Sequence, residues 1–218
     1  MGYRDQHLVE LCRNKKIVHF GCTDWPYQFE QIQKGNLLHS KLIETTKEVI
    51  GVDIDSNGIN ELKKIYPNQH FITGDVSRKN NLVEEILTFK PDILLIPDVL
   101  EHIEDSRTFL SAIAVILRES QSIAIFTTPN SNSLKTYLPI FLNLDFTHPD
   151  HCLLHNEFTI SHMLKDSEIN ISAINYLSRD ISSKYGTLFQ VMSFPIDLLS
   201  RIFPRLADTL IVVTEPTK

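Results

Sequence analysis

Short apolar runs alternate with longer amphipathic segments along most of this 218-residue chain. That rhythm is typical of βαβ units, in which parallel strands are buried on both faces of a sheet. The runs predicted as strands are Lys16–Phe20, Val49–Asp53, His70–Thr73, Ile93–Pro97, Ser122–Thr127, Ile171–Tyr176 and Leu210–Thr214. The pattern predicts an α/β fold, a Rossmann-like three-layer sandwich around a mostly parallel, seven-stranded sheet.

Helical patterns separate these strands. The clearest is Ser106–Arg118, where Phe109, Ile113, Ile116 and Leu117 recur at the spacing of one apolar helix face, with Asp105 or Ser106 as the expected N-cap. The other predicted helices are Tyr27–Lys34, Ser56–Ile65, Asn81–Phe89 and Thr159–Asp166.

The pattern becomes irregular after Thr128. Leu134–Leu144 and Thr187–Leu206 are rich in apolar and aromatic residues, and prolines interrupt the second of these segments. We expect core packing or a lid over a substrate, with a dimer interface or contact with a lipid-linked substrate as alternatives. The whole chain is predicted to be a single domain, residues 1–218, with a helical insertion at about 181–206.

Charge and cysteine content narrow the class of protein. A net charge of −6 disfavours nucleic-acid partners, which usually meet basic surfaces. Three cysteines without a CxxC pair fit a reducing compartment. Met1–Lys16 lacks the apolar core of a signal peptide, and no apolar run reaches the ~18 residues of a membrane helix. We expect a cytoplasmic protein without a transmembrane segment, and a homodimer is possible.

Acidic residues follow each of the first four predicted strands. In an open parallel sheet, ligands bind at the carboxyl ends of the strands. The segments there are Gly21-Cys22-Thr23-Asp24-Trp25, Gly51-Val52-Asp53-Ile54-Asp55, Gly74-Asp75-Val76 and Asp98-Val99-Leu100-Glu101-His102. Each acidic residue alone has a second interpretation, as a helix cap or a helix-start charge. Acidic residues at the same end of four predicted strands together predict a binding site.

Together these segments resemble the class I S-adenosylmethionine-dependent methyltransferases, particularly the ubiquinone-pathway-like branch that acts on small molecules. The family's Gly-x-Gly-x-Gly loop aligns with Gly21, Thr23 and Trp25, of which only the first is glycine. The resemblance implies that Asp53 binds the ribose hydroxyls and Asp75 the adenine amine, and it places the Leu-Glu-His-like run at Asp98–His102. The implied S-adenosylmethionine-binding residues are Gly21, Cys22, Thr23, Asp53, Ile54, Asp75, Val76, Asp98 and Leu100.

The residue types suit this cofactor. Two vicinal hydroxyls and an amine are all donors, and an ionised aspartate accepts from them through charge-assisted hydrogen bonds. Acidic strand ends favour a cationic sulfonium over a pyrophosphate. A dinucleotide enzyme would need Gly-x-Gly-x-x-Gly, but positions 23 and 26 are Thr and Pro.

The acceptor side is expected among the histidines between residues 148 and 162, which are His148, His151, His155 and His162. An imidazole titrates near neutral pH and can deprotonate a hydroxyl. We predict His151 as the general base, with His148 and His102 as further candidates, against the alternative that they only pack or cap loops. A divalent metal is the less favoured interpretation, since the spacing matches no standard zinc site, and no metal ligand is predicted.

These residues predict methylation of a small-molecule acceptor, at the hydroxyl of a sugar or secondary metabolite. The alternative is a catalytically silent binding or partner protein that keeps the fold, for which Thr23 and Trp25 are the main argument.

Overall fold

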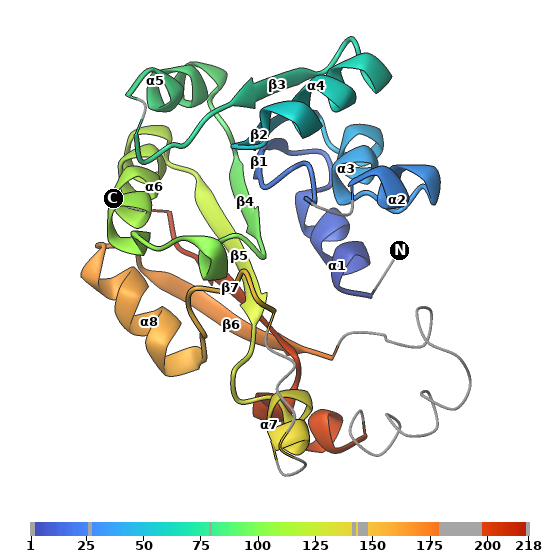
Figure 1. The fold of residues 1–218 in the computed structure, drawn as a ribbon. Coiled ribbons are helices and arrows are strands. Elements are labelled where there is room, and N and C mark those ends of the chain that lie inside the picture. Colours follow the sequence, from blue (N-terminus) through green and yellow to red (C-terminus); the bar gives the residue numbers. More distant parts are fainter. Residues whose placement is uncertain are drawn as a thin grey trace.

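The computed structural model describes residues 3–25, 28–78, 80–140, 143, 148–178 and 198–216. It contains a seven-stranded sheet in the order β3-β2-β1-β4-β5-β7-β6 (Figure 1). The strands are β1 (Lys16–Phe20), β2 (Glu48–Asp53), β3 (His70–Thr73), β4 (Ile93–Pro97), β5 (Ile123–Pro129), β6 (Ile171–Leu177) and β7 (Thr209–Thr214). Within the described residues, β7 runs antiparallel to β5 and β6 on its two sides, and the pairs among β1, β2, β3, β4 and β5 are parallel. The predicted mostly parallel sheet is confirmed.

Helices cover both faces of this sheet, which gives the three layers that the strand pattern predicts. On one face lie α1 (Tyr3–Cys12), α3 (Leu38–Thr45) and α4 (Ser56–Ile65), whose apolar side chains pack with those of β1, β2, β3 and β4. On the other lie α5 (Asn80–Phe89), α6 (Ser106–Ser120) and α8 (Glu157–Asp166). Because both faces are covered, the central strand β4 is buried along its whole length.

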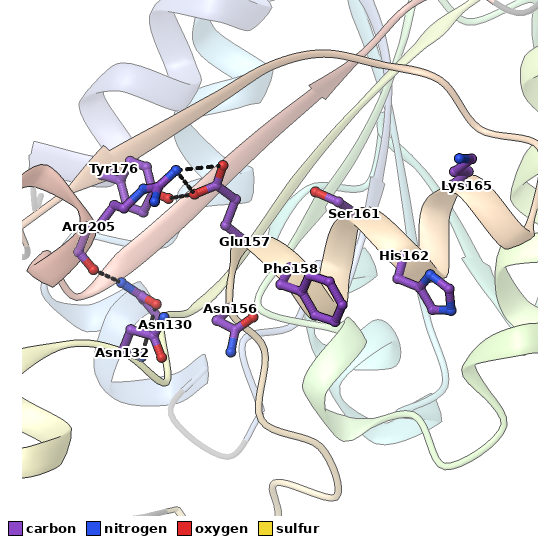
Figure 2. A pocket seen from close by; sticks show the side chains of 10 residues that line it. All are labelled: Asn130, Asn132, Asn156, Glu157, Phe158, Ser161, His162, Lys165, Tyr176 and Arg205. Atoms are coloured by element: carbon purple, nitrogen blue, oxygen red, sulfur yellow. Dashed lines mark hydrogen bonds and ion pairs between the residues drawn. The ribbon is translucent and has the colours of Figure 1, made fainter.

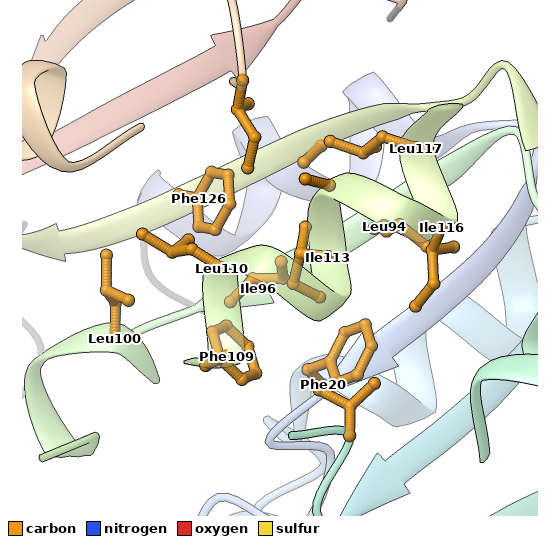
Figure 3. Close-up of a cluster of buried hydrophobic side chains, with 14 of the residues drawn as sticks. Phe20, Leu94, Ile96, Leu100, Phe109, Leu110, Ile113, Ile116, Leu117 and Phe126 are labelled. Atoms are coloured by element: carbon orange, nitrogen blue, oxygen red, sulfur yellow. The ribbon is translucent and has the colours of Figure 1, made fainter. Parts of the chain in front are cut away.

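The largest hydrophobic cluster joins α6 to the sheet (Figure 3). Phe109, Ile113 and Leu117 of α6 are buried against strand residues that include Phe126. Asp105 is the N-cap, since its carboxylate accepts the Thr108 N–H at 3.1 Å. The apolar stripe and one of the two expected caps of this helix are therefore confirmed.

Two helices on the opposite face were not predicted. In α1, Leu8, Val9 and Cys12 are buried, but polar residues outnumber them and hide the apolar face. In α3, no side chain caps the N-terminus, so the usual start signal is absent. The predicted helix Tyr27–Lys34 corresponds to the short α2 (Gln28–Gln33).

The C-terminal third contains α7 (Leu134–Ile140), which forms the start of the apolar segment Leu134–Leu144. Most of the predicted insertion, residues 181–197, lies outside the described residues; residues 198–202 are helical and are followed by η2 (Pro204–Leu206). The single-domain assignment and the homodimer stay predictions. Across the described ranges, no helix combines the length and apolarity needed to cross a membrane.

A buried histidine pair joins β1 to α3. His19 and His39 are 2% and 0% exposed, their rings stack at 5.3 Å, and their Nδ1 atoms are 3.1 Å apart. One Nδ1 must donate and the other accept, so at least the accepting ring is neutral. Burial lowers the pKa of His39 to about 3, and burial, with His39 and Arg4 nearby, lowers the pKa of His19 well below its usual value.

This pair predicts a pH-dependent stability. The unfolded chain binds protons at these histidines below about pH 6.5, whereas in the folded chain His39 does so only near pH 3 and the pKa of His19 is also well below its usual value. The stability that both histidines contribute is therefore complete above pH 6.5 and falls as the pH drops from there. We expect the free energy of unfolding in urea to fall by up to about 1.4 kcal/mol per pH unit for each histidine. His39→Leu should flatten this slope, while replacement of the exposed His162 by Gln should not. An unchanged slope in His39→Leu would contradict the assignment.

Candidate active site

The loop after β1 is held to the end of β2 by Asp53. Its Oδ2 accepts the Thr23 N–H at 3.0 Å and the Thr23 hydroxyl at 2.8 Å, and its Oδ1 accepts the Asp55 N–H at 2.9 Å. Asp53 is therefore not the cap of α4, a role that belongs to Asp55. A carboxylate has about four acceptor positions, and the described residues occupy one of those on Oδ1, which leaves the other to a ligand hydroxyl.

Thr23, at the second glycine position of the loop, is accommodated by a glycine elsewhere. Its side chain is fully buried, and a Cβ at Gly58 of α4 would lie 2.8 Å from the Thr23 methyl. The Thr23 side chain thus packs between Asp53 and Gly58. Trp25 is 61% exposed, so its ring does not pack in the core. Gly21 keeps the positive φ of 71° that this tight turn requires.

The remaining predicted cofactor residues divide into two groups. Ile54 is 76% exposed beside Asp53, whereas Cys22, Val76 and Leu100 are buried in hydrophobic clusters. Their side chains have a packing role, and their contact with a cofactor stays a prediction. Asp75 accepts the Ser77 N–H at 2.9 Å and lies 3.2 Å from the Arg78 guanidinium, so it also fulfils the alternative role of a turn cap.

Asp98, at the end of β4, lies in a network that includes an unpredicted arginine. Its Oδ1 accepts the Thr127 hydroxyl at 2.8 Å, and its Oδ2 pairs with Arg4 of α1. Burial opposes the charge of Arg4, but Asp98 and Asp5 outweigh it and raise the pKa of Arg4. Asp24 and Asp98 both have positive φ, 55° and 49°, a conformation that Asp tolerates and that is common at functional sites.

Side chains of metal-ligating type come together at a short helix that follows Asp98. The short helix η1 (Leu100–His102) carries Glu101, which is 1% exposed, and His102. The loop from residue 148 is fixed to η1 because the N–H groups of Cys152 and Leu153 both donate to the Glu101 carbonyl, at 2.9 and 3.2 Å. Ligand atoms of Glu101, His102 and His151 all lie within 4.8 Å of one another.

The three predicted base candidates thus lie side by side. The ring of His102 is 4.8 Å from that of His151, and the ring of His148 is 5.2 Å from His151. His102 Nδ1 lies 3.0 Å from the Asp150 carbonyl, to which it must donate, so the lone pair of the neutral ring is on Nε2. This second contact is the usual way in which a metal-binding histidine is oriented.

The donor set of one carboxylate and two imidazoles fits a first-row divalent cation. The sequence did not predict this, because Glu101 was assigned no role beyond its motif and the histidines alone match no metal spacing. The other two histidines of the segment do not belong to this set of three ligand groups. His155 is buried in the bridge to Asn130, where burial lowers its pKa, and His162 pairs with Asp166 on α8.

A pocket of about 550 Å³ opens beside α8 (Figure 2). It is lined by Asn130, Asn132, Asn156, Glu157, Phe158, Ser161, His162, Lys165, Tyr176 and Arg205. Glu157 accepts the Tyr176 hydroxyl and pairs with Arg205 at 3.1 Å; burial and Glu157 raise the pKa of Tyr176 to about 12. Asn156 follows His151 by five positions, so the Cα atoms of this lining residue and of His151 are at most roughly 18 Å apart.

Comparison with known proteins supports a fold assignment. No protein-family model and no curated protein matches the sequence. Among solved structures, the small RNA methyltransferase HEN1 has a TM-score of 0.63 at 17% identity, with 99% of this chain and 25% of that chain covered. An S-adenosylmethionine-dependent methyltransferase from Clostridium acetobutylicum has a TM-score of 0.59 at 13% identity, covering 98% and 91% of the two chains.

A third structure, the N-methyltransferase NodS from Bradyrhizobium japonicum in complex with S-adenosyl-L-homocysteine, has a TM-score of 0.57 at 11% identity and covers 99% of this chain and 86% of that one. At these identities the likeness concerns the fold, and it does not distinguish the ubiquinone-pathway-like branch. The chain has the Rossmann-like fold of the S-adenosylmethionine-dependent methyltransferases.

Proposed function

We propose that this protein is an S-adenosylmethionine-dependent methyltransferase that acts on a hydroxyl group. The observation that carries the proposal is the cluster of Glu101, His102 and His151. Glu101 follows Asp98 by three residues, so the cluster lies at the same strand end as the proposed cofactor site. Methyl transfer to a hydroxyl needs an acceptor that loses its proton, and this cluster supplies groups for that task.

The cofactor fits the residues at the strand ends. Asp53 has an acceptor position left for a ribose hydroxyl, and the exposed Ile54 provides an apolar surface next to it. Asp75 lies at the next strand end, where an acceptor for the adenine amine is expected. The cofactor supplies the methyl group, and the protein's contribution is to hold donor and acceptor in line.

Glu101, His102 and His151 would hold a divalent cation, which would act as a Lewis acid on the acceptor hydroxyl. Without a cation, His151 is the candidate base, as the sequence predicts, and Glu101 beside it would stabilise its protonated form. Metal dependence distinguishes these two forms of the proposal.

The pocket beside α8 supports an acceptor that is a sugar or a sugar derivative. Asn132 and Asn156 offer amide groups for vicinal hydroxyls, and the exposed Phe158 offers a ring face. A small-molecule sugar is the first candidate. The second is a ribose hydroxyl of RNA, which is favoured by the likeness to HEN1 and by Lys165 at the pocket, although the net charge of −6 opposes it.

The test has two stages. Calorimetry with S-adenosylmethionine and S-adenosylhomocysteine should show binding of each ligand. A protein that binds neither ligand would overturn the proposal. Transfer of a labelled methyl group is then measured to sugars, nucleosides and short RNAs, with Mn²⁺, with Zn²⁺ and with a chelator. Binding without transfer to any acceptor would instead support the silent partner protein. An RNA acceptor should show strong salt dependence, which a neutral sugar should not.

A further inference from the structure

Two neighbouring ridges of α8 line the pocket beside this helix (Figure 2). Glu157, Ser161 and Lys165 follow one another at intervals of four residues and form a polar ridge. Phe158 and His162, one position further on, form an aromatic ridge next to it. Side chains four residues apart share one face of a helix. A ligand that lies along α8 would therefore meet polar groups on one side and ring faces on the other.

The polar ridge has an excess of positive charge. Glu157 accepts the Tyr176 hydroxyl and pairs with Arg205, whose Nη2 lies 3.1 and 3.3 Å from the two carboxylate oxygens. The charge of Glu157 is thus balanced, and the guanidinium has further N–H donors for a ligand. Within the described part of the chain, the Lys165 ammonium has neither a hydrogen bond nor an ion pair. Although the net charge of the protein is −6, this ridge attracts anions.

The aromatic ridge presents ring faces to a planar ligand. Phe158 is 79% exposed, so packing in the core does not explain this side chain. Its ring is parallel to that of His162, with an interplanar angle of 0° and 6.3 Å between the ring centroids. Exposed rings of this kind stack on nucleobases. The ridge therefore suits a ligand with a flat, conjugated ring.

The pocket extends further than one sugar ring needs. Lys165 follows Glu157 by eight positions in α8, which corresponds to roughly 12 Å along the helix axis. A volume of about 550 Å³ is also in the range of sites for ligands of several linked rings. Asn156, at the start of α8, is the lining residue closest in sequence to His151, so the hydroxyl proposed for methylation belongs at this end. The rest of the ligand would lie along the helix toward Lys165.

We infer that this pocket binds the nucleoside diphosphate part of a nucleotide-linked sugar, an inference that rests on the proposed function and names its acceptor. Lys165 and Arg205 would bind the phosphate oxygens, Phe158 would stack on the nucleobase, and the sugar would lie at Asn156. An RNA strand needs a track of cations along its phosphates. Among the described lining residues the permanent cations are Lys165 and Arg205, which is enough for one diphosphate.

Calorimetry with uridine diphosphate and with inorganic pyrophosphate, both without cofactor, tests the inference. The wild-type protein should bind both, and uridine diphosphate more tightly. Lys165→Gln should weaken binding of both probes by about 10-fold, because a charge-assisted contact is lost. Phe158→Leu should weaken binding of uridine diphosphate by about 10-fold and leave that of pyrophosphate unchanged, because only stacking is lost. Both side chains are exposed, so thermal unfolding should not change.

Arg201→Gln and Leu154→Ala are the matched controls, since both residues are exposed and do not line the pocket. They should change neither affinity. A wild-type protein that does not bind uridine diphosphate would overturn the inference, and so would displacement of this probe by saturating S-adenosylhomocysteine, which would place it at the cofactor site. A short single-stranded RNA that binds more than about 10-fold tighter, and that loses this affinity in Lys165→Gln, would overturn it in favour of an RNA acceptor.

These outcomes leave the proposed methyl transfer intact, because transfer and cofactor binding are measured separately. A protein that binds uridine diphosphate but neither S-adenosylmethionine nor S-adenosylhomocysteine would instead overturn the proposed function and, with it, the role of the nucleotide-linked sugar as an acceptor.

Discussion

Replacing Glu101 with glutamine is expected to reduce methyl transfer at least about 100-fold without weakening the binding of S-adenosylhomocysteine. The substitution keeps the shape of this buried side chain and removes its charge. The charge matters in both forms of the proposed chemistry, because it binds a cation together with His102 and His151 or stabilises a protonated His151. The measurements are initial rates and calorimetric titration with Mn²⁺ and Zn²⁺.

Glu104→Gln is the matched control for this prediction, since Glu104 lies three residues along the chain but is exposed. It should leave rates and metal affinity unchanged. Loss of metal binding together with loss of rate in Glu101→Gln assigns Glu101 as a ligand, and loss of rate alone assigns it to the support of His151. Full activity in Glu101→Gln would show that the cluster has no part in the reaction.

The sheet could be predicted because its signals are local. A buried parallel strand is a short apolar run, and the residues just past it are at the carboxyl edge whatever the rest of the chain does. The positions of Asp53 and Asp98 at this edge could therefore be predicted from their strands alone, while their contact with a cofactor stays a prediction. The helix α6 was found for the same reason, since its apolar stripe and its cap Asp105 lie within one segment.

The contacts that complete the candidate site are long-range and could not be predicted in this way. His151 meets Glu101 because backbone N–H groups of residues 152 and 153 bind the Glu101 carbonyl, and no spacing in the sequence encodes that contact. Arg4 reaches Asp98 across 94 positions from a helix whose apolar face is masked by polar neighbours. The Thr23 side chain, at a glycine position of the loop after β1, fits only because Gly58 of α4 has no side chain.

The second large effect is expected at Asp53. Asp53→Ala should weaken binding of S-adenosylhomocysteine at least about 100-fold, because it removes the charged acceptor proposed for the ribose and also releases the Thr23 and Asp55 donors that fix the loop. Asp53→Asn should weaken binding less, since its amide oxygen can still hold part of the loop. Calorimetry measures both, and thermal unfolding reports how much of the loss comes from the loop itself.

Asp92 offers the control that separates these two causes. It too accepts a backbone N–H, that of Lys16 at 2.8 Å, but it precedes β4 and so lies at the amino edge of the sheet, away from the proposed site. Asp92→Ala should therefore lower stability by an amount typical of one lost hydrogen bond, about 1 kcal/mol, and leave the affinity unchanged. If Asp53→Ala did no more than this, Asp53 would be a loop anchor alone, and the ribose contact implied by the family resemblance would have to be abandoned.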